Sequence, residues 1–316
     1  MDQLDIRILR ELFQAFTLWP ARPGLFSSYR EIARKLGVAP GTVRNRVREM
    51  SRTGFLQGTA VYANPAILGL ESGSFAVEIG AGVRKEEVIR RLSAVPGIVF
   101  FENFHGRLLG MGVCYERESA LRPLLNRVER IAHSAPGMYS RVRHPTPSGS
   151  LTTAEWRLID RLMAGNVRSY VQLARELQMS TRTLKRRLRR LIESGAVLSF
   201  PLLDFRSLPG GVTAELLVSY APDRPEARVR ALQRLDDWMI YAGVWEEFDI
   251  YRLILPNVAV AAELAREIQG WEGIRFARVE LVEGLISHVD ALRPYVLRQM
   301  AHRDVRVRRP TTPLSR

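Results

Sequence analysis

Residues 29–54 read YREIARKLGVAPGTVRNRVREMSRTG, and residues 170–195 read YVQLARELQMSTRTLKRRLRRLIESG. The two stretches align without a gap, with Tyr29 opposite Tyr170 and further identical residues at intervals up to the final glycine. Internal repetition is the first property to establish, because it sets the architecture of the whole chain. The repeat predicts a protein made of two related halves.

Each copy has the pattern of two short helices joined by a tight turn. In the first copy, Ile32, Ala33 and Leu36 recur at helical spacing and predict one apolar face. Gly37 then suits the left-handed conformation that ends a helix, and Pro40 suits the first turn of the next helix. The spacing therefore predicts the core of a helix-turn-helix in each half.

The two turns differ in their residues. Gln178 stands where the first copy has Gly37, so we expect the second turn to be strained or differently shaped. Ser180 precedes the last helix of the second copy and suits an N-cap, whereas Ala39 in the first copy does not. The sequence thus predicts two related turns with different stabilisation.

The last helix of each copy has one apolar face and one cationic face. Val43, Val47 and Met50 share a face in the first copy, and the polar residues lie opposite. In a helix-turn-helix this helix enters the major groove of DNA, where Arg or Asn side chains reach base edges. The residues that we expect to face DNA are Thr42, Arg44, Asn45, Arg46 and Arg48 in the first copy, and Thr181, Arg182, Lys185, Arg186 and Arg189 in the second.

The positive charge of the chain is concentrated in a few segments. The 316 residues include 47 Lys and Arg against 33 Asp and Glu, a formal charge of +14. Each repeat holds seven Lys and Arg against two Asp and Glu, so the two repeats carry +10, and residues 303–316 carry +4. The remainder balances to zero. This distribution is the footprint expected of a protein that binds the phosphates of double-stranded DNA.

After each repeat the hydrophobic pattern changes from helical spacing to alternation. A short hairpin, a wing that turns at Gly58, is expected after the first repeat. Strand and helix patterns then follow in the order β-α-β-β-α-β, which is the ferredoxin-like arrangement, and this order recurs in the second half. The predicted fold class is α+β, a tandem repeat of a winged helix-turn-helix plus a ferredoxin-like domain.

These patterns divide the chain into six segments. We expect winged helix-turn-helix domains at 1–70 and 151–208, ferredoxin-like domains at 71–144 and 209–290, an exposed PTPSGS linker at 145–150, and a C-terminal helix with a basic tail at 291–316. Two prolines and a glycine predict a loop at 19–28. The last helix is expected to be short, at 293–301, with a disordered end or an arm along DNA phosphates beyond it.

Composition limits the compartment and the chemistry. Cys114 is the only cysteine, the N-terminus does not have the pattern of a signal peptide, and no run approaches ~20 apolar residues. We expect a cytoplasmic, nucleoid-associated protein that does not insert into membranes. The chain shows no phosphate-cradling glycine loop, Ser/His/Asp order or metal-ligand cysteine spacing. We therefore expect no catalytic residues, no metal site and no cofactor.

Several segments together carry a resemblance to a known family. The first half resembles the leucine-responsive/asparagine regulator (Lrp/AsnC) family of transcription factors, and the second half resembles a diverged copy of it. The resemblance is carried by LDIRIL at 4–9, YREIA at 29–33, LGV at 36–38, TVRNRV at 42–47 and Gly54. It implies two family protomers fused in tandem, with DNA-binding helix-turn-helix units and ferredoxin-like domains that make a homodimer or an intramolecular pseudo-dimer.

The resemblance also implies a small effector, such as an amino acid, bound at the ferredoxin-like domains. Family members commonly place an acidic residue in the hairpin between the two middle strands. The candidate effector-binding residues are His105 and Arg107 in the first half, and Glu246, Glu247 and Asp249 in the second. The alternative is that these are ordinary polar residues of exposed hairpins.

Two other functions are considered. Siroheme decarboxylases are similar to the same regulator fold, also as paired or fused halves, and His105 with Asn103, Arg107 and Tyr115 nearby would suit such an enzyme. However, the five histidines do not show the paired spacing of a catalytic or metal cluster. A sequence-neutral architectural protein fits the charge equally well. The strongly basic helix-turn-helix surfaces and the poor match of the strand-pair motif also argue against the enzyme. Asn45 can make a bidentate contact with adenine, and we therefore predict a sequence-specific regulator.

Overall fold

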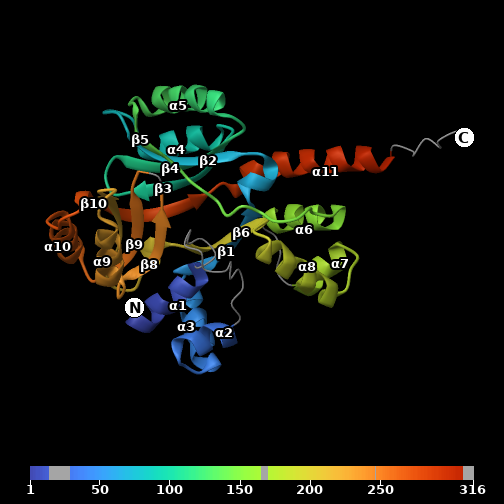
Figure 1. Cartoon of the computed structure of the whole chain (residues 1–316), viewed down its shortest axis with the longest axis horizontal. Coiled ribbons are helices and arrows are strands. Elements are labelled where there is room, and N and C mark those ends of the chain that lie inside the picture. The colour runs from blue at the N-terminus through green and yellow to red at the C-terminus, as the bar shows by residue number, and fades with distance from the viewer. Residues whose placement is uncertain (14–28, 165–169, 246, 309–316) are drawn as a thin grey trace, which may run out of the picture.

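The chain folds as two successive sets of the same elements. The computed structural model describes residues 1–13, 29–164, 170–245 and 247–308 (Figure 1). Three helices and a strand are followed by a β-α-β-β-α-β unit, and this order occurs twice. The α+β fold class predicted from the sequence is therefore confirmed. The loop expected at 19–28, Glu246 and the end of the tail at 309–316 lie outside the described residues.

Each helix-turn-helix unit consists of three helices. They are α1 (Gln3–Phe13), α2 (Tyr29–Leu36) and α3 (Pro40–Arg52) in the first unit, and α6 (Thr153–Met163), α7 (Tyr170–Glu176) and α8 (Thr181–Glu193) in the second. Ile8 and Leu9 of α1 are fully buried against the helix pair, and Leu158 and Ile159 of α6 take the matching places. The apolar stripes seen in the sequence are thus the inner faces of these helices.

A strand follows each helix-turn-helix unit, and the two strands pair with each other. They are β1 (Leu56–Ala63) and β6 (Val197–Leu203), which form an antiparallel two-stranded ribbon. The hairpin predicted at Gly58 is therefore wrong. Gly58 instead lies at an irregularity in the pairing, with a φ of 148° that favours glycine. The backbone groups of β1 are satisfied by the corresponding strand of the other half rather than by a local turn.

The two β-α-β-β-α-β units have the same strand order. The first contains β2 (Glu71–Glu78), α4 (Lys85–Ser93), β3 (Ile98–Phe104), β4 (Leu108–Tyr115), α5 (Glu118–Ala132) and β5 (Pro136–Arg141). The second contains β7 (Val212–Tyr220), α9 (Pro225–Leu235), β8 (Met239–Val244), β9 (Asp249–Leu255), α10 (Val258–Gln269) and β10 (Ile274–Ser287). The orders β5-β2-β4-β3 and β10-β7-β9-β8 are equivalent and antiparallel, as in a ferredoxin-like sheet.

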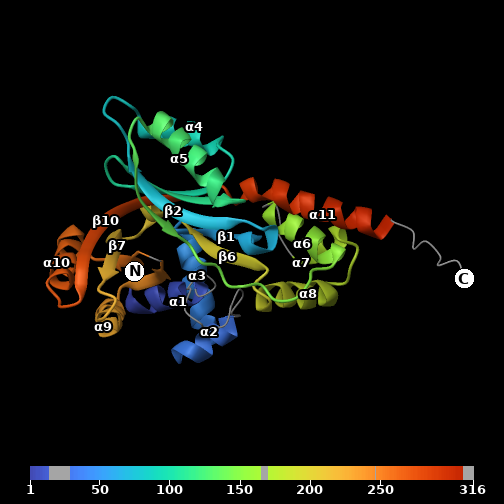
Figure 2. The ribbon, with the colours of Figure 1, turned by 45° about the horizontal axis from the view of Figure 1, so that its top comes forward.

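One long strand joins the two sheets into one of eight strands. β10 has 14 residues, pairs with β7 over residues 274–281 and then with β3 over residues 282–287. Figure 2 shows α4 and α5 over one half of this sheet, and α9 and α10 over the other half. Because the helices cover only one face of each half, the opposite faces are free to face the interior of the molecule.

The last described helix is longer than predicted. Three short 3₁₀ helices lie at η1 (Pro65–Leu68), η2 (Phe205–Ser207) and η3 (Val289–Leu292), and η3 leads into α11 (Arg293–Arg308). The expectation of a disordered end directly after residue 301 is wrong, because α11 continues for seven more residues to 308.

The two helix-turn-helix units rest on different parts of the molecule. α1 lies against β8, where Arg10 Nε donates to the carbonyl oxygen of Met239 at 2.8 Å and Arg10 pairs with Asp236 at 2.6 Å. α6 lies along α11, where Arg293 pairs with Asp160 at 2.6 Å (Figure 1). The first unit is thus fixed to the second ferredoxin-like sheet, and the second unit to the C-terminal helix.

Candidate functional site

α3 presents a polar face to solvent. Val43 and Val47 are buried beneath the helix, whereas Arg44, Asn45 and Arg48 are exposed on it. None of these three exposed side chains has a hydrogen bond or an ion pair within the described part of the chain. Two cations and one amide are therefore available to bind a partner.

α8 presents a more strongly cationic face. Arg182, Lys185, Arg186 and Arg189 are exposed, and the three arginines have no ion pair with the described residues. The ammonium group of Lys185 lies 5.6 Å from the ring centre of Tyr170, a cation–π contact that holds it at the surface. Four positive charges thus lie on one helix face, twice the number on the corresponding face of α3.

The other residues of the predicted set are less exposed. Thr42 and Thr181, in the first turns of α3 and α8, are half-buried. Arg46 is also half-buried and points to the start of α1, where its Nη1 lies 2.8 Å from Asp2 and 3.4 Å from Asp5. Burial raises the pKa of Asp5 above its usual value. Arg46 therefore ties α3 to α1, an interaction that the spacing of α3 alone could not reveal.

The second unit has a comparable tie between its first and last helices. Arg187, which aligns with Arg46, donates from Nη1 to Thr152 Oγ1 at 3.1 Å. Arg190 lies 3.5 Å from Glu155, whose side chain is fully buried at the start of α6 and forms a capping box with Thr152. In both units, arginines of the last helix thus contact acidic or polar residues at the start of the first helix.

The turns that position α3 and α8 have the same shape. Gly37 has a φ of 69° and Gln178 a φ of 52°, so both lie in the left-handed region. The next residue in each turn makes an equivalent backbone hydrogen bond, Val38 N–H to Ala33 O at 3.0 Å and Met179 N–H to Ala174 O at 2.9 Å. Gln178 therefore adopts the strained conformation that its position requires, and the alternative of a differently shaped turn is wrong.

The candidate effector residues of the first half lie at the β3–β4 hairpin. His105 Nδ1 lies 2.9 Å from Glu283 of β10, and both side chains are largely exposed. Arg107 Nε donates to the carbonyl oxygen of Ile79 at 2.7 Å. Both residues therefore have partners that hold the hairpin in place.

The candidates of the second half lie at the β8–β9 hairpin, and those that are described differ in their exposure to solvent. Glu247 is exposed, and its carbonyl oxygen accepts a hydrogen bond from Ser219. Asp249 is buried, with its carboxylate 2.7 Å from Arg228 Nε, and burial raises its pKa. Among the described candidates, no contact joins the two hairpins. The effector candidates that the structure describes therefore do not form a single cluster.

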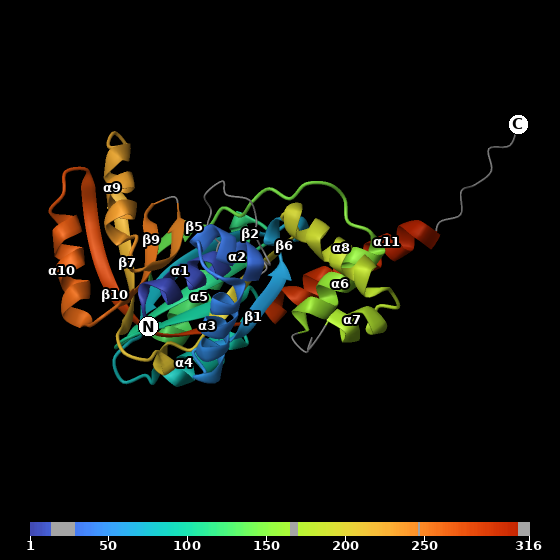
Figure 3. The ribbon, with the colours of Figure 1, turned by 90° about the horizontal axis from the view of Figure 1, so that it is seen from below.

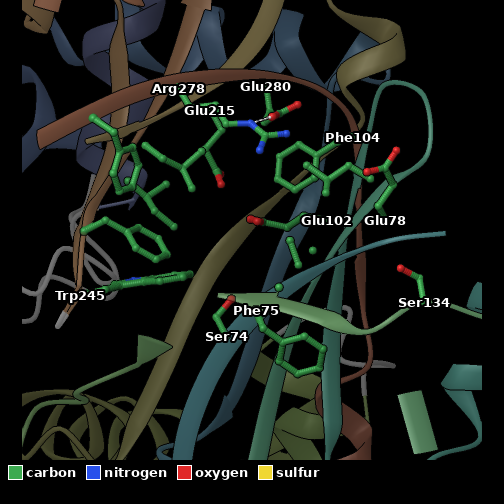
Figure 4. Close-up of a pocket in the computed structure, with 18 of the residues that line it drawn as sticks. Ser74, Phe75, Glu78, Glu102, Phe104, Ser134, Glu215, Trp245, Arg278 and Glu280 are labelled. Atoms are coloured by element: carbon green, nitrogen blue, oxygen red, sulfur yellow. Dashed lines mark hydrogen bonds and ion pairs between the residues drawn. The ribbon is translucent and has the colours of Figure 1, made fainter. Parts of the chain in front are cut away.

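A cavity lies between the inner faces of the two half-sheets. Its volume is about 640 Å³, and it is lined by residues of β2, β3, β4, β7, β9 and β10 together with the β8–β9 hairpin (Figure 4). Aromatic rings form part of its walls: Phe104, Trp245, Phe248 and Phe276. Both hairpins were predicted from the sequence to bind an effector through polar residues, whereas the aromatic neighbours of those residues line the cavity.

The cavity is also lined by carboxyl groups. Glu102 and Glu215 contact the same guanidinium group, that of Arg252, and Glu280 pairs with Arg278. Figure 4 shows the carboxyl groups of Glu102 and Glu215 directed into the cavity from different strands. Burial, followed by the charge of Glu102, raises the pKa of Glu215 to about 8. In the sequence, the feature that could have indicated this site is Glu215, which lies within the apolar run of a strand.

Within the described part of the chain, no cluster of three or more His, Cys, Asp or Glu side chains is arranged to hold a metal ion. Among the described helices, none combines the length and apolar character needed to cross a membrane.

Comparison with known proteins gives a match for the first helix-turn-helix unit. Residues 1–51 match the model of the AsnC-type helix-turn-helix domain. An HTH-type transcriptional regulator of Methanocaldococcus jannaschii is 32% identical over 99 residues, which are 31% of this chain and 61% of that protein. The regulatory protein AsnC of Escherichia coli K12 is 24% identical over 134 residues, which are 42% of this chain and 82% of that protein. The chain spans about 60% of the length of the first of these relatives.

A solved structure is similar over nearly the whole chain. The crystal structure of the siroheme decarboxylase NirDL, in complex with an iron-uroporphyrin III analogue, has a TM-score of 0.51 and 14% sequence identity. The match covers 93% of this chain and 99% of that chain. At this identity the likeness concerns the fold alone, and it extends over both sets of elements.

Proposed function

We propose that this protein is a sequence-specific, DNA-binding transcriptional regulator with two reading heads. α3 and α8 each enter the major groove of double-stranded DNA, and a small effector bound at the ferredoxin-like domains modulates binding. The proposal is supported by the AsnC-type domain at residues 1–51 and by relatives named as transcriptional regulators. Figure 3 shows both helix-turn-helix units next to the β1–β6 ribbon.

The observation that carries the proposal is the set of unpaired cations on the outer faces of α3 and α8. Some surface arginines elsewhere in this chain pair with carboxylates, such as Arg90 with Glu87. Arg44 and Arg48 on α3 have none among the described residues, and neither have Arg182, Arg186 and Arg189 on α8. Phosphate groups of DNA are the partners that such faces suit.

The two heads have different roles in this proposal. Asn45 on α3 makes a bidentate contact with adenine, so the first head discriminates between sequences. At the corresponding position α8 has Arg186, and its four cations bind mainly phosphates. We assign Arg46 a positioning role, because its guanidinium is held by Asp2 and Asp5. Thr42 and Thr181 remain candidates for phosphate contacts at the helix starts.

We also infer that the chain is a fusion of two Lrp/AsnC-like protomers that fold into an intramolecular pseudo-dimer. The β1–β6 ribbon supports this inference, because equivalent strands of the two halves pair there as they would in two subunits. The β3–β10 pairing joins non-equivalent strands of the two halves and does not follow this symmetry. Since the heads differ, the two half-sites in the DNA need not be identical. The operator is therefore not required to be a palindrome.

Fluorescence anisotropy with a selected operator and with random DNA tests the proposal. Asn45→Ala should weaken operator binding by roughly 1–3 kcal/mol while leaving random-DNA binding nearly unchanged. Glu49→Ala, on the same helix but paired with Arg52, is the matched control for a change in α3. Equal losses for both DNAs in Asn45→Ala would reject specific reading by α3. Equal affinity of the wild type for operator and random DNA would favour an architectural role.

A siroheme decarboxylase is the second candidate, favoured by the fold likeness over 93% of the chain. The charge of the inter-sheet cavity argues against it. Among the described lining residues, four glutamates face one arginine, and siroheme is itself a polycarboxylate, so the two would repel each other. Turnover of siroheme by the purified protein would establish the enzyme.

A further inference from the structure

The inter-sheet cavity has a charge imbalance in its wall. Arg252 contacts both Glu102 and Glu215, and the three side chains are 5%, 13% and 2% exposed. When both carboxyl groups are ionised, this cluster carries one uncompensated negative charge, which is unfavourable in a buried place. The neighbouring pair Arg278–Glu280 is neutral and does not supply the missing positive charge.

The same cluster contains an unsatisfied donor. Arg252 Nε–H has no acceptor among the described atoms, although the residue is only 4% exposed. Arg252 lines a smaller space of about 120 Å³, which adjoins the main cavity because Glu102 and Trp245 line both. Buried donors are nearly always hydrogen-bonded. The cluster therefore lacks one hydrogen-bond acceptor and, when both carboxyl groups are ionised, one positive charge.

The rest of the cavity wall is suited to an organic ligand. Trp245 stands at one side of the cavity with its ring toward the space into which Glu102 and Glu215 point (Figure 4). Phe104 closes another side. Aromatic faces attract cations and pack against flat apolar groups, and a ligand site typically combines such walls with a few convergent polar groups.

We propose that the inter-sheet cavity binds a small organic amine that also carries an oxygen acceptor. Its ammonium group lies between Glu102 and Glu215, and its apolar body lies against Trp245 and Phe104. Its oxygen reaches the adjoining smaller space, where it accepts from Arg252 Nε. Anionic ligands of the same shape are excluded by the carboxylates. The site differs from the polar hairpin residues chosen from the sequence.

Binding at this site is coupled to protonation. Glu215 on β7 has a pKa raised to about 8, and the groups that face it are Arg252 on β9, Glu102 on β3, Glu280 on β10 and Tyr241 on β8. In the empty cavity at neutral pH, Glu215 is therefore mostly protonated. An ammonium group favours the ionised form and displaces this proton, so affinity should rise with pH up to about 8, by at most about tenfold per pH unit.

Isothermal titration calorimetry of the full chain tests the site. The probe is tyramine, which has an ammonium group, an aromatic ring and a phenolic oxygen, and the control is 3-(4-hydroxyphenyl)propionate, its anionic analogue. We expect saturable binding of tyramine with release of a proton at pH 7, and at least tenfold weaker binding of the acid. Equal or tighter binding of the acid, or no saturation by tyramine at about 10 mM, ten times a millimolar Kd, would overturn the proposal.

Variants separate the cavity from the hairpin. Trp245→Ala should weaken tyramine binding about tenfold by removing one aromatic wall. Glu247→Gln, an exposed residue of the same hairpin that does not line the cavity, should leave it unchanged. Glu215→Gln should abolish proton release, measured in two buffers of different ionisation enthalpy. If Glu215→Gln does not fold, the wild-type proton release decides, and its absence contradicts the proposed cluster.

An effect of the amine on DNA binding rests on the proposed function, whereas the binding of the amine does not. Tyr241, which lies near the cluster, also packs against Phe13 of α1 with ring centres 5.9 Å apart. Tyramine should therefore shift the DNA affinity of the first head. Tyramine binding by a protein that does not bind DNA would reject only the regulator, and DNA binding without tyramine binding would reject only the cavity site.

Discussion

In the first helix-turn-helix unit the turn before α3 contains Gly37, and Ala39 at the start of α3 offers no side-chain cap. In the second unit the turn contains Gln178 in the same left-handed conformation, and the side chain of Ser180 caps α8 by accepting from the N–H of Thr183 at 3.1 Å. Each turn thus has one of the two usual stabilising features. The two turns thus have the same backbone shape, but different positions in them stabilise it.

The units also differ in charge and in attachment. α8 has four exposed cations on its outer face and α3 has two, and α1 rests on a sheet whereas α6 rests on α11. The first unit, which carries Asn45, is thus the one connected to the sheet that lines the cavity. If the proposed function holds, specificity and regulation belong to the first head, and electrostatic affinity belongs to the second.

The largest expected effect comes from removing the charge of α8. Replacing Arg182, Lys185, Arg186 and Arg189 by alanine should reduce the slope of log affinity against log salt by about 4, whereas Arg44→Ala with Arg48→Ala should reduce it by about 2. Binding titrations at four salt concentrations measure both slopes. Arg122→Ala with Arg127→Ala, exposed on α5, is the control and should not change the slope. Equal slopes for the α8 variant and the wild type would contradict the assignment of phosphate contacts to α8.

An exchange of the turn residues should affect stability in opposite directions. Gly37→Gln should lower the free energy of unfolding by roughly 1–2 kcal/mol, because a side chain disfavours a φ of 69° even though no atom lies within 4 Å of the added Cβ. Gln178→Gly should raise the free energy of unfolding, because glycine adopts the left-handed φ of 52° without the cost that a side chain adds. Gly41→Ala, at a position in α3 that is equally open, is the control and should stabilise by up to about 1 kcal/mol. Urea denaturation measures all three, and a neutral Gly37→Gln would show that the turn tolerates side chains.

An exchange of the cap residues should have a smaller effect. Ser180→Ala should lower the free energy of unfolding by about 1 kcal/mol, because the N–H of Thr183 loses its acceptor. Ala39→Ser should raise it by a similar or smaller amount, since Ala39 already has the extended backbone of a cap residue. Thermal denaturation of the two variants measures this difference. No change in either variant would mean that the caps do not distinguish the two units.

The pH dependence of stability reports on the cavity rather than on the heads. Because the pKa of Glu215 is raised to about 8 in the folded state, the folded protein binds more protons than the unfolded chain between pH of about 4.5 and 8. This contribution to stability is fully present below that range and is lost as the pH rises through about 8. Glu215→Gln should remove this part of the pH profile in urea denaturation. An unchanged profile would show that Glu215 does not titrate there.

The sequence predicted the parts of the fold that depend on local spacing. The stripe of Val43 and Val47, and the alternation in the strands, have fixed periods, so the elements and their order could be derived. The pairing of β1 with β6 could not, because alternation predicts a strand but not its partner. For the same reason the alternation could not show that the last residues of β10 pair with β3 of the other half.

The site could be predicted only where it lies on one element. The exposure of Arg44 and Arg48 follows from helical spacing, and contact with DNA remains a prediction. Arg46 was also predicted to face DNA, because the spacing within α3 does not reveal its partner Asp5, which lies 41 residues away in the sequence. The cavity depends on still longer separations, such as the 150 residues between Glu102 and Arg252, and no local pattern brings these residues together.

Whether two unlike heads of one chain read DNA together can be tested by selecting bound fragments from random double-stranded DNA with the 316-residue chain. We expect an enriched site with two different half-sites on one face of the duplex, about 10–10.5 base pairs apart or a multiple of one helical turn. Enrichment of no sequence, or of a single half-site whose recovery does not depend on α8, would contradict it.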